Sequence, residues 1–335
     1  MPDSIFTPFE TDDIIPGQVS VVSSGMWSGG VGTLTAFYTS STQSGSTGEH
    51  YYDVYNGIVG TNATASVQFS VTFGDINGSG SLSGDSNYKA SKAIYRQLRN
   101  LLLPQNQTTF KFGAADATSS NTVFGMTINR TRLKEKMDPG NWEIHLSGSA
   151  GKTLKLIDDS GATADPNVKQ TVREFNIISG SIASGTAVTG SSTKYYGKFY
   201  PEPGLLVFDA NLMMNYMNMT GYATASNNND NNSEAFYNSI KGGAYFAARR
   251  EEQIKSTHYF CRVKHHKYNH SQNPTYYSGS NANLTISSFR TDPKSYITTV
   301  GLYNGANELL AVAKLSRPIL KSTNREALIK VRLDF

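Results

Sequence analysis

The sequence predicts a mainly β fold of the β-rich α+β class, with antiparallel β-sandwich-type domains, one or two short helices and long loops. Composition is the first reason: the 335 residues include 19 Tyr and 16 Phe, which suit strands, and 30 Gly, which suit turns. The second reason is a set of short runs in which apolar and polar residues alternate. Charged residues make up 17% of the chain, and this low share, together with the many aromatic residues, separates it from disordered sequences.

The chain divides into four predicted segments. Residues 1–20 are expected to form an extended N-terminal arm, and residues 21–150 an N-terminal β-rich domain that contains one helix at about 86–103. Residues 151–250 are predicted to form a middle region of strands and loops. Residues 251–335 are predicted to form a C-terminal antiparallel β-domain.

The arm contains Pro2, Pro8 and Pro16, which remove backbone donors and hold the preceding residues in extended conformations. We therefore expect no helix in this segment. An extended arm must pack against its own domain or against a neighbouring subunit. Its apolar side chains are the candidate interface residues: Ile5, Phe6, Phe9, Ile14 and Ile15.

Alternation and apolar runs predict the strands of the first domain, at residues 31–38, 51–55, 64–74, 108–112, 122–129 and 142–146. The helix is predicted from apolar residues spaced by three and four between Ala90 and Leu102. Asp85 or Ser86 can cap this helix, and Pro104 stops it. Before the last of these strands, Asp138-Pro139-Gly140-Asn141 has the residue order of a β-turn.

The second half of the chain begins with a stretch that is rich in Gly, Ser and Thr and has weak secondary-structure signals. Short strands are predicted within it at residues 154–157 and 174–178. Residues 147–171 are the expected linker or inserted loop. A turn at Pro201–Gly204 should lead into an apolar strand at residues 205–208. Residues 233–248 are a possible helix, weakened by Gly242 and Gly243.

The C-terminal segment carries the clearest strand signals. Residues 295–303 and 308–315 are predicted to form a hairpin around Asn304–Asn307, and residues 327–335 a closing strand with one wet face. We expect the hairpin, the closing strand and the strand at residues 258–263 to form one antiparallel sheet.

Several classes of protein and partner are disfavoured by the sequence. No apolar run approaches the roughly 20 residues of a membrane span, and the first residues do not resemble a secretory signal. The single cysteine excludes an internal disulfide, which favours synthesis in a reducing host cytoplasm. The net charge of +4 is a mild excess, and the basic stretches at residues 130–136 and 262–267 are interpreted as solvated faces. We therefore expect no nucleic acid or membrane partner.

Common catalytic motifs are missing from the sequence, including the phosphate-binding loop, the nucleophile elbow and the His-Glu-x-x-His helix. One cluster could bind zinc: His258, Cys261, His265, His266 and His270. We favour the alternative in which Cys261 is a small hydrophobic residue on a strand and the histidines lie in a polar loop. The prediction is therefore no catalytic residue, no cofactor and no metal ligand.

The C-terminal segment also resembles a known family. The runs Tyr296–Asn304, Glu308–Pro318 and Glu326–Phe335, with His258–Lys264 and Asn269–Pro274 upstream, are similar to sequences in structural proteins of contractile-tailed bacteriophages (myophages), including phages of cyanobacteria. The hairpin strands and the terminal strand also resemble those of baseplate wedge and tail-fibre-attachment proteins. The resemblance does not extend convincingly to residues 1–250, where only the composition agrees.

This resemblance implies a structural protein of the virion, present in several copies and bound to other virion subunits of the tail or baseplate. A baseplate wedge subunit is the first hypothesis. A neck, fibre-connector or capsid-decoration protein is the alternative within the virion. An enzyme, such as a tail-associated glycan hydrolase, is the alternative of another class, but such an enzyme needs two opposed carboxylates that no motif supplies.

Overall fold

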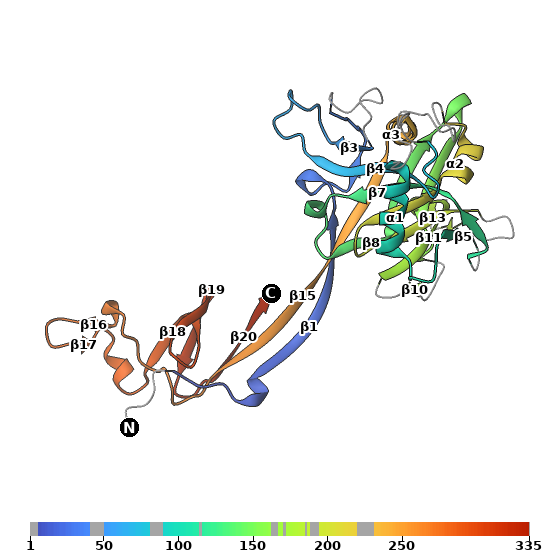
Figure 1. Cartoon of the computed structure of the whole chain (residues 1–335). Coiled ribbons are helices and arrows are strands. Elements are labelled where there is room, and N and C mark those ends of the chain that lie inside the picture. Colours follow the sequence, from blue (N-terminus) through green and yellow to red (C-terminus); the bar gives the residue numbers. More distant parts are fainter. Residues whose placement is uncertain are drawn as a thin grey trace. The chain divides into compact units, whose positions relative to one another are not determined.

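The computed structural model describes residues 6–40, 50–80, 90–113, 116–161, 167–169, 172–184, 186–187, 194–219 and 231–334. The chain forms two compact units (Figure 1). Unit 1 comprises residues 1–20 and 253–335, and unit 2 comprises residues 21–252. The chain passes between the units within two long strands, β1 (Ile14–Gly25) and β15 (Phe246–Val263).

Unit 2 is built on one large antiparallel sheet, in which β1 is followed in order by β15, β8, β9, β11, β13, β14, β7, β4 and β3. These strands are β3 (Tyr51–Tyr55), β4 (Val67–Asp75), β7 (Thr122–Ile128), β8 (Lys136–Ser147), β9 (Thr153–Asp158), β11 (Val172–Ser181), β13 (Tyr195–Tyr200) and β14 (Leu205–Asp209). Short strands complete the unit: β2 (Thr33–Leu34) pairs with β15, β10 (Asn167–Lys169) and β12 (Thr186–Ala187) pair with β11, and β5 (Phe110–Phe112) pairs with β6 (Thr118–Ser120). Strands make up 49% of the structure, so the predicted mainly β, antiparallel class is confirmed.

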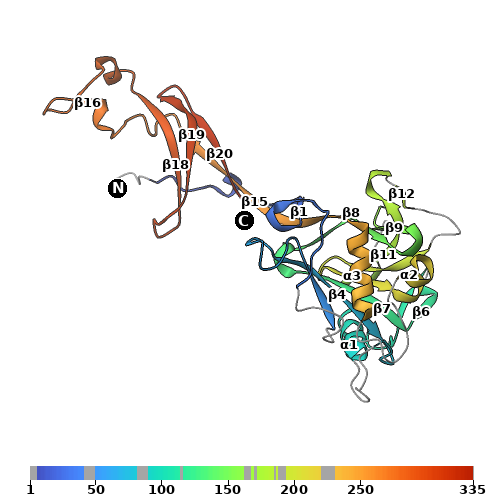
Figure 2. The ribbon, with the colours of Figure 1, turned by 90° about the horizontal axis from the view of Figure 1, so that it is seen from above.

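Side chains of a strand alternate between the two faces of the sheet, so each face needs a layer that buries its apolar side chains. Helices form this layer on both faces. Helix α1 (Ala90–Leu102) lies on one face, while α2 (Ala210–Met217) and α3 (Asn231–Gly243) lie on the other (Figures 1 and 2). Two glycines in the sheet allow α1 to pack closely against it. A Cβ atom on Gly74 would meet the backbone of Tyr95 at 3.0 Å, and one on Gly125 would meet the Leu98 side chain at 3.1 Å. Unit 2 is therefore a layered structure in which helices cover the sheet where a second sheet was expected.

The main core lies between the sheet and α3. Phe236 of α3 is fully buried, and its ring stacks on Phe124 of β7 at 4.6 Å and contacts Phe208 of β14 at 5.4 Å. The helix approaches β8 closely, because a Cβ atom on Gly243 would lie 2.0 Å from the carbonyl oxygen of His145. Gly243 therefore permits this contact, and the helix ends at this residue, before Ala244 with its positive φ of 50°.

Unit 2 differs from the sequence-based predictions in three places. Asp138–Asn141 is not a turn between separate elements but a bulge inside β8, where the pairing with β15 shifts between Ala248 and Arg250. α2 is an additional helix, and its N-cap is Asp209, whose side chain accepts hydrogen bonds from the N–H groups of Asn211 and Leu212. The boundary predicted near residue 150 falls between β8 and β9, which pair with each other inside one unit.

Unit 1 contains two β-ribbons. The second part of β15 pairs with β20 (Ala327–Asp334), and β18 (Lys294–Tyr303) pairs with β19 (Leu309–Ser322). The remaining elements are the short hairpin β16 (Tyr277–Ser278) and β17 (Asn283–Leu284), and single turns of 3-10 helix that include Thr11–Asp13. The predicted pairing of the closing strand with residues 258–263 is confirmed. The hairpin turn is also confirmed, with Asn304 Oδ1 accepting hydrogen bonds from the N–H groups of Ala306 and Glu308.

The expectation of a single C-terminal sheet is wrong. Among the described strands, β18 and β19 pair only with each other. Their inner face packs on the β15–β20 ribbon through a cluster centred on Leu302, Ile329 and Val331. An alternating hairpin can bury its apolar face in this way without joining the neighbouring sheet by hydrogen bonds. Unit 1 is therefore a small sandwich of two ribbons.

Within the described residues, none of the helices is both long enough and apolar enough to cross a bilayer.

Candidate functional site

A groove with a volume of about 970 Å³ runs along unit 1, and all of its lining residues belong to that unit. β18 lines it without interruption from Ser295 to Tyr303, and the N-terminal segment Phe6–Glu10 lines it as well. The end of β15 contributes Cys261–Lys264. Consecutive side chains of a strand point to opposite faces, so an uninterrupted run of lining residues means that the edge of β18 faces the groove.

The groove has an apolar floor and an aromatic rim. The floor includes Leu302 and Ile329, each only 6% exposed, which belong to the core between the ribbons. On the rim, Tyr268 is 45% exposed and Tyr296 is 62% exposed. Tyrosine offers a large apolar area and a hydroxyl that remains in water, a combination typical of protein-binding surfaces.

Charged residues surround the groove. Arg262 Nε lies 2.5 Å from Asp13 Oδ1, and Lys264 Nζ lies 3.8 Å from Glu10 Oε1. The backbone N–H of Glu10 and the Arg262 guanidinium hold the pKa of Asp13 below its ordinary value, because both stabilise the carboxylate. Lys267 is a half-buried residue of the groove lining, and its ammonium group has no ion pair or hydrogen bond within the part of the chain that the structure describes.

A buried lysine holds the loop that carries Lys267 and Tyr268. Lys321 is fully buried, and its Nζ donates hydrogen bonds of 2.8 Å to the carbonyl oxygen of His265, to Asn269 Oδ1 and to the carbonyl oxygen of Ser322. Burial lowers the pKa of Lys321. This wall of the groove is therefore tied to β19 by charge-assisted hydrogen bonds and is preformed.

The predicted arm residues are only partly brought together by the structure. Phe6 contacts the ring of Tyr303 at 4.8 Å and Phe9 contacts Tyr259 at 5.6 Å, and both line the groove. Ile14 and Ile15 lie on β1, 37% and 45% exposed, and do not line it. Ile5 lies outside the described residues. Over its described part the arm follows its own unit in extended form, apart from the 3-10 turn, and a contact with another subunit stays a prediction.

The His/Cys cluster is spread over two faces of a strand and a loop. Cys261 packs with Tyr259 against the core of unit 1, whereas His258 has the opposite parity on β15. Burial raises the pKa of the Cys261 thiol, and the charge of Asp13 adds to this. His265 bonds Glu326 at 3.1 Å, and His270 contacts Tyr277. Among the described residues, no three His, Cys, Asp or Glu side chains are placed to hold a metal ion.

Unit 1 also exposes large apolar side chains outside the groove. Leu309, Leu310 and Val312 of β19 are 52%, 67% and 59% exposed, and Leu328 of β20 is 62% exposed. None of these four lines the groove. Unit 1 also holds 12 Lys and Arg against 8 Asp and Glu, so that the whole net charge of +4 resides in it.

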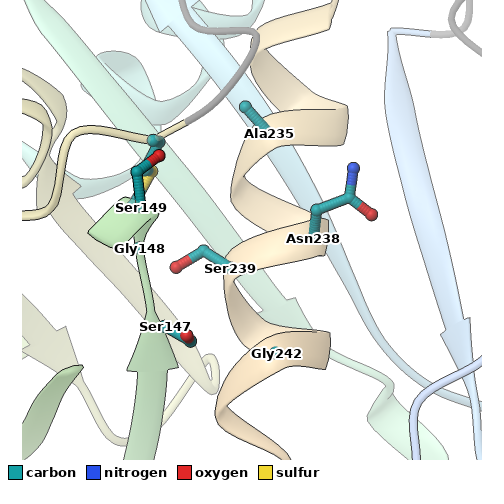
Figure 3. A pocket seen from close by; sticks show the side chains of 8 residues that line it. Ser147, Gly148, Ser149, Ala235, Asn238, Ser239 and Gly242 are labelled. Carbon is teal, nitrogen blue, oxygen red and sulfur yellow. The ribbon is translucent and has the colours of Figure 1, made fainter. Parts of the chain in front are cut away.

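A second, smaller pocket of about 280 Å³ lies in unit 2 between α3 and the end of β8 (Figure 3). Its walls include Ser147, Ser149, Asn238 and Ser239, and the Ser239 hydroxyl points toward the two serines of the β8 side. The Ser239 Oγ atom is buried and has no hydrogen-bond partner among the described residues. The lining holds no acidic, basic or thiol group, so the pocket offers contacts for a small polar molecule but no acid–base chemistry.

Unit 2 contains a buried polar cluster around Glu143. Its carboxylate lies 2.6 Å from His145 Nε2 and accepts hydrogen bonds from Ser181 Oγ at 2.9 Å and from the N–H of Ile182 at 2.8 Å. Burial by itself would raise the pKa of Glu143, but these three donors outweigh it and hold the pKa below its ordinary value of 4.5. A carboxylate with a lowered pKa stabilises the fold at pH values above 4.5, and this contribution is lost as the pH falls.

We therefore expect Glu143→Gln to lower the free energy of unfolding at pH 7 by about 1–3 kcal/mol. Between pH 5 and pH 3 the variant should lose less stability than the parent, because the group that titrates is gone. Urea unfolding across this pH range measures both effects. Glu135→Gln is the matched control, because Glu135 is exposed and should change neither the stability nor its pH dependence. If the free energy of unfolding falls equally steeply between pH 5 and pH 3 in the parent and in Glu143→Gln, the proposed role of the Glu143 carboxylate is wrong.

Sequence reasoning missed the groove residues Lys267, Tyr296 and Tyr303. The two tyrosines could have been found from the sequence, because they lie on a predicted hairpin strand, where an exposed aromatic side chain indicates a binding surface. Comparison of the chain with protein-family models, with curated proteins and with solved structures found no match.

Proposed function

We propose that this chain is a structural subunit of a contractile-tailed bacteriophage particle, a component of the baseplate wedge, that acts through protein–protein interfaces. The observation that carries the proposal is the cluster of exposed apolar side chains on unit 1, in which Leu310 and Val312 are more than half exposed. Large apolar side chains that stay exposed at neighbouring positions of a strand are typical of interaction sites, because their contact with water is unfavourable.

The proposed class of particle is supported by the position of the exposed residues in the sequence. They lie in β19 and β20, two of the strands whose runs resemble phage structural proteins. A docking role agrees with the way unit 1 is built, since a small two-ribbon sandwich buries little core of its own and leaves strand edges open. The excess of basic residues in unit 1 favours an acidic partner surface.

The proposal is tested by incorporation into particles. Leu310→Asp and Val312→Asp place a charge in the proposed interface at positions that are already exposed, so that the free chain should still fold. We expect particles assembled with either variant to contain much less of the chain than particles assembled with the parent. Leu101→Asp is the matched control, because Leu101 is 59% exposed on α1 in unit 2 and outside the proposed interface.

Quantitative mass spectrometry of purified particles measures incorporation, and circular dichroism of the free chains checks that each variant is folded. If folded Leu310→Asp and Val312→Asp chains enter particles as well as the parent does, the proposed interface is wrong. If the parent chain is absent from purified particles, the proposed class of protein is wrong. Cross-links between the chain and its neighbours in the particle distinguish a wedge from a neck, fibre-connector or capsid position.

A further inference from the structure

The outer edge of β18 is an unpaired strand edge that faces a groove. β18 pairs with β19 on one side only. Within the described residues, no backbone hydrogen bond reaches the other edge of the strand between Tyr296 and Tyr303. Alternate residues of an edge strand direct their N–H and C=O groups outward, so this edge offers a row of donors and acceptors to a further strand.

From this geometry we propose that the groove of unit 1 binds an extended segment of a partner polypeptide, which adds a strand to the edge of β18 and carries an acidic residue for Lys267. This inference rests on the proposed function, because it names the kind of partner segment that the interface of unit 1 takes. Addition of a strand to an open sheet edge is a known mode of peptide recognition, in which main-chain hydrogen bonds supply affinity and pockets select alternate side chains.

The apolar floor of the groove would contact every second side chain of such a segment. Leu302 and Ile329 present apolar surface at the base, and Val300 adds to it. A strand bound along β18 would direct alternate side chains toward this floor and the others toward solvent. The segment is therefore expected to alternate apolar and polar residues.

The position of the added strand is limited by irregularities in the hairpin. The pairing of β18 with β19 shifts between Ile297 and Thr299 and again between Leu302 and Tyr303. Bulges twist a strand edge and interrupt pairing, so the regular stretch Thr299–Leu302 is where the added strand should pair. A helix cannot supply hydrogen bonds to a strand edge, which is why an extended segment is the proposed occupant.

Charge selects one further feature of the segment. Arg262 and Lys264 already have acidic partners in Asp13 and Glu10, whereas the Lys267 ammonium has none within the described residues. Lys267 is half-buried in the lining, where a charge without a partner is unfavourable. A carboxylate on the bound segment would satisfy it.

The test uses the full chain and a synthetic peptide as the probe. In the peptide, valines alternate with threonines and a glutamate follows at one end. NMR titration should show that the amide signals of Thr299–Leu302 shift on binding. A peptide with the same residues in scrambled order should bind more weakly. A peptide N-methylated at every residue keeps its side chains but lacks donors, and we expect it to bind at least about ten-fold more weakly because it loses two or more hydrogen bonds.

Variants of the chain test the role of Lys267. We expect Lys267→Glu to weaken binding of the acidic peptide by about five-fold. Lys255→Glu is the matched control, with the same change of charge at an exposed position of unit 1 outside the groove lining, and should change binding less than about two-fold. Both variants should keep the melting temperature of the parent, because neither lysine has an ion pair in the described structure.

Two results would overturn the inference: binding of the N-methylated or scrambled peptide as tight as that of the alternating one, or no binding of the alternating peptide at all. If Lys267→Glu and Lys255→Glu weakened peptide binding equally, Lys267 would have no specific part in the binding site. These failures are distinguishable from failure of the proposed function, because incorporation of the chain into particles is measured separately.

Discussion

Phe236→Ala is expected to lower the free energy of unfolding of unit 2 by about 3–5 kcal/mol. The side chain is fully buried between α3 and the sheet, stacked on Phe124 and in contact with Phe208. Its removal loses the transfer free energy of the ring and leaves a cavity that the surrounding strands cannot fill. A loss of this size is a large part of the 5–15 kcal/mol by which typical domains are stable.

Tryptophan fluorescence during urea unfolding measures this effect in unit 2 alone. The chain has two tryptophans, Trp27 and Trp142, and both are buried in unit 2. Leu101→Ala is the control, since Leu101 is 59% exposed on α1 and should cost about 0.5 kcal/mol or less. If Phe236→Ala and Leu101→Ala unfold at the same urea concentration, the packing of α3 on this face is wrong.

The second large effect is expected at Lys198, whose charge is buried in unit 2. Lys198 Nζ lies 3.0 Å from Asp116 Oδ1 and 3.3 Å from Glu174 Oε1, and it donates a hydrogen bond of 2.9 Å to Asn176 Oδ1. Lys198 and Glu174 are 3% and 2% exposed. Burial and the charge of Glu174 also raise the pKa of Tyr200 well above its ordinary value. Lys198 thus contacts two carboxylates and an amide oxygen of this cluster.

Lys198→Met should lower the free energy of unfolding by about 3–5 kcal/mol, because it removes the ammonium group that is ion-paired with the buried Glu174 carboxylate. The double change Lys198→Met with Glu174→Gln should recover part of the loss, since the buried negative charge is removed together with the positive one. Arg173→Met is the control: the Arg173–Glu202 pair is more than a third exposed on both sides, and such pairs contribute about 0–1 kcal/mol. The same tryptophan signal measures all three variants, and a double change as unstable as Lys198→Met would contradict this interpretation of the charge.

Local patterns predicted those elements whose partners lie nearby or whose faces are clearly amphipathic. The apolar stripe between Ala90 and Leu102 corresponds to α1, and alternation identified β4 and β20. The Asn304–Asn307 turn could be predicted from its residues, because Asn and Gly favour the backbone conformations of a turn. Asn307 indeed has a positive φ of 63°.

Other elements depend on contacts that sequence patterns do not contain. Asp138–Asn141 has the residues of a turn, yet the pairing of β8 with β15 on both sides of it turns it into a bulge. α2 is short, and its one local signal is Asp209 as the N-cap. The groove could not be predicted, because its walls come from the two ends of the chain, Phe6–Glu10 and Ser295–Tyr303.

The most direct measurement for the proposed role is hydrogen exchange of unit 1 in the free chain and in the assembled particle. We expect amides of residues 296–303 and 309–316 to exchange several-fold more slowly in the particle, because the edge of β18 and the exposed face of β19 would be covered by partners there. Peptides from the core of unit 2, such as those around Phe124, serve as the internal reference and should exchange equally slowly in both states. If particles contain the chain but exchange at residues 296–303 and 309–316 is unchanged, unit 1 does not dock on other subunits, and the proposed role is wrong.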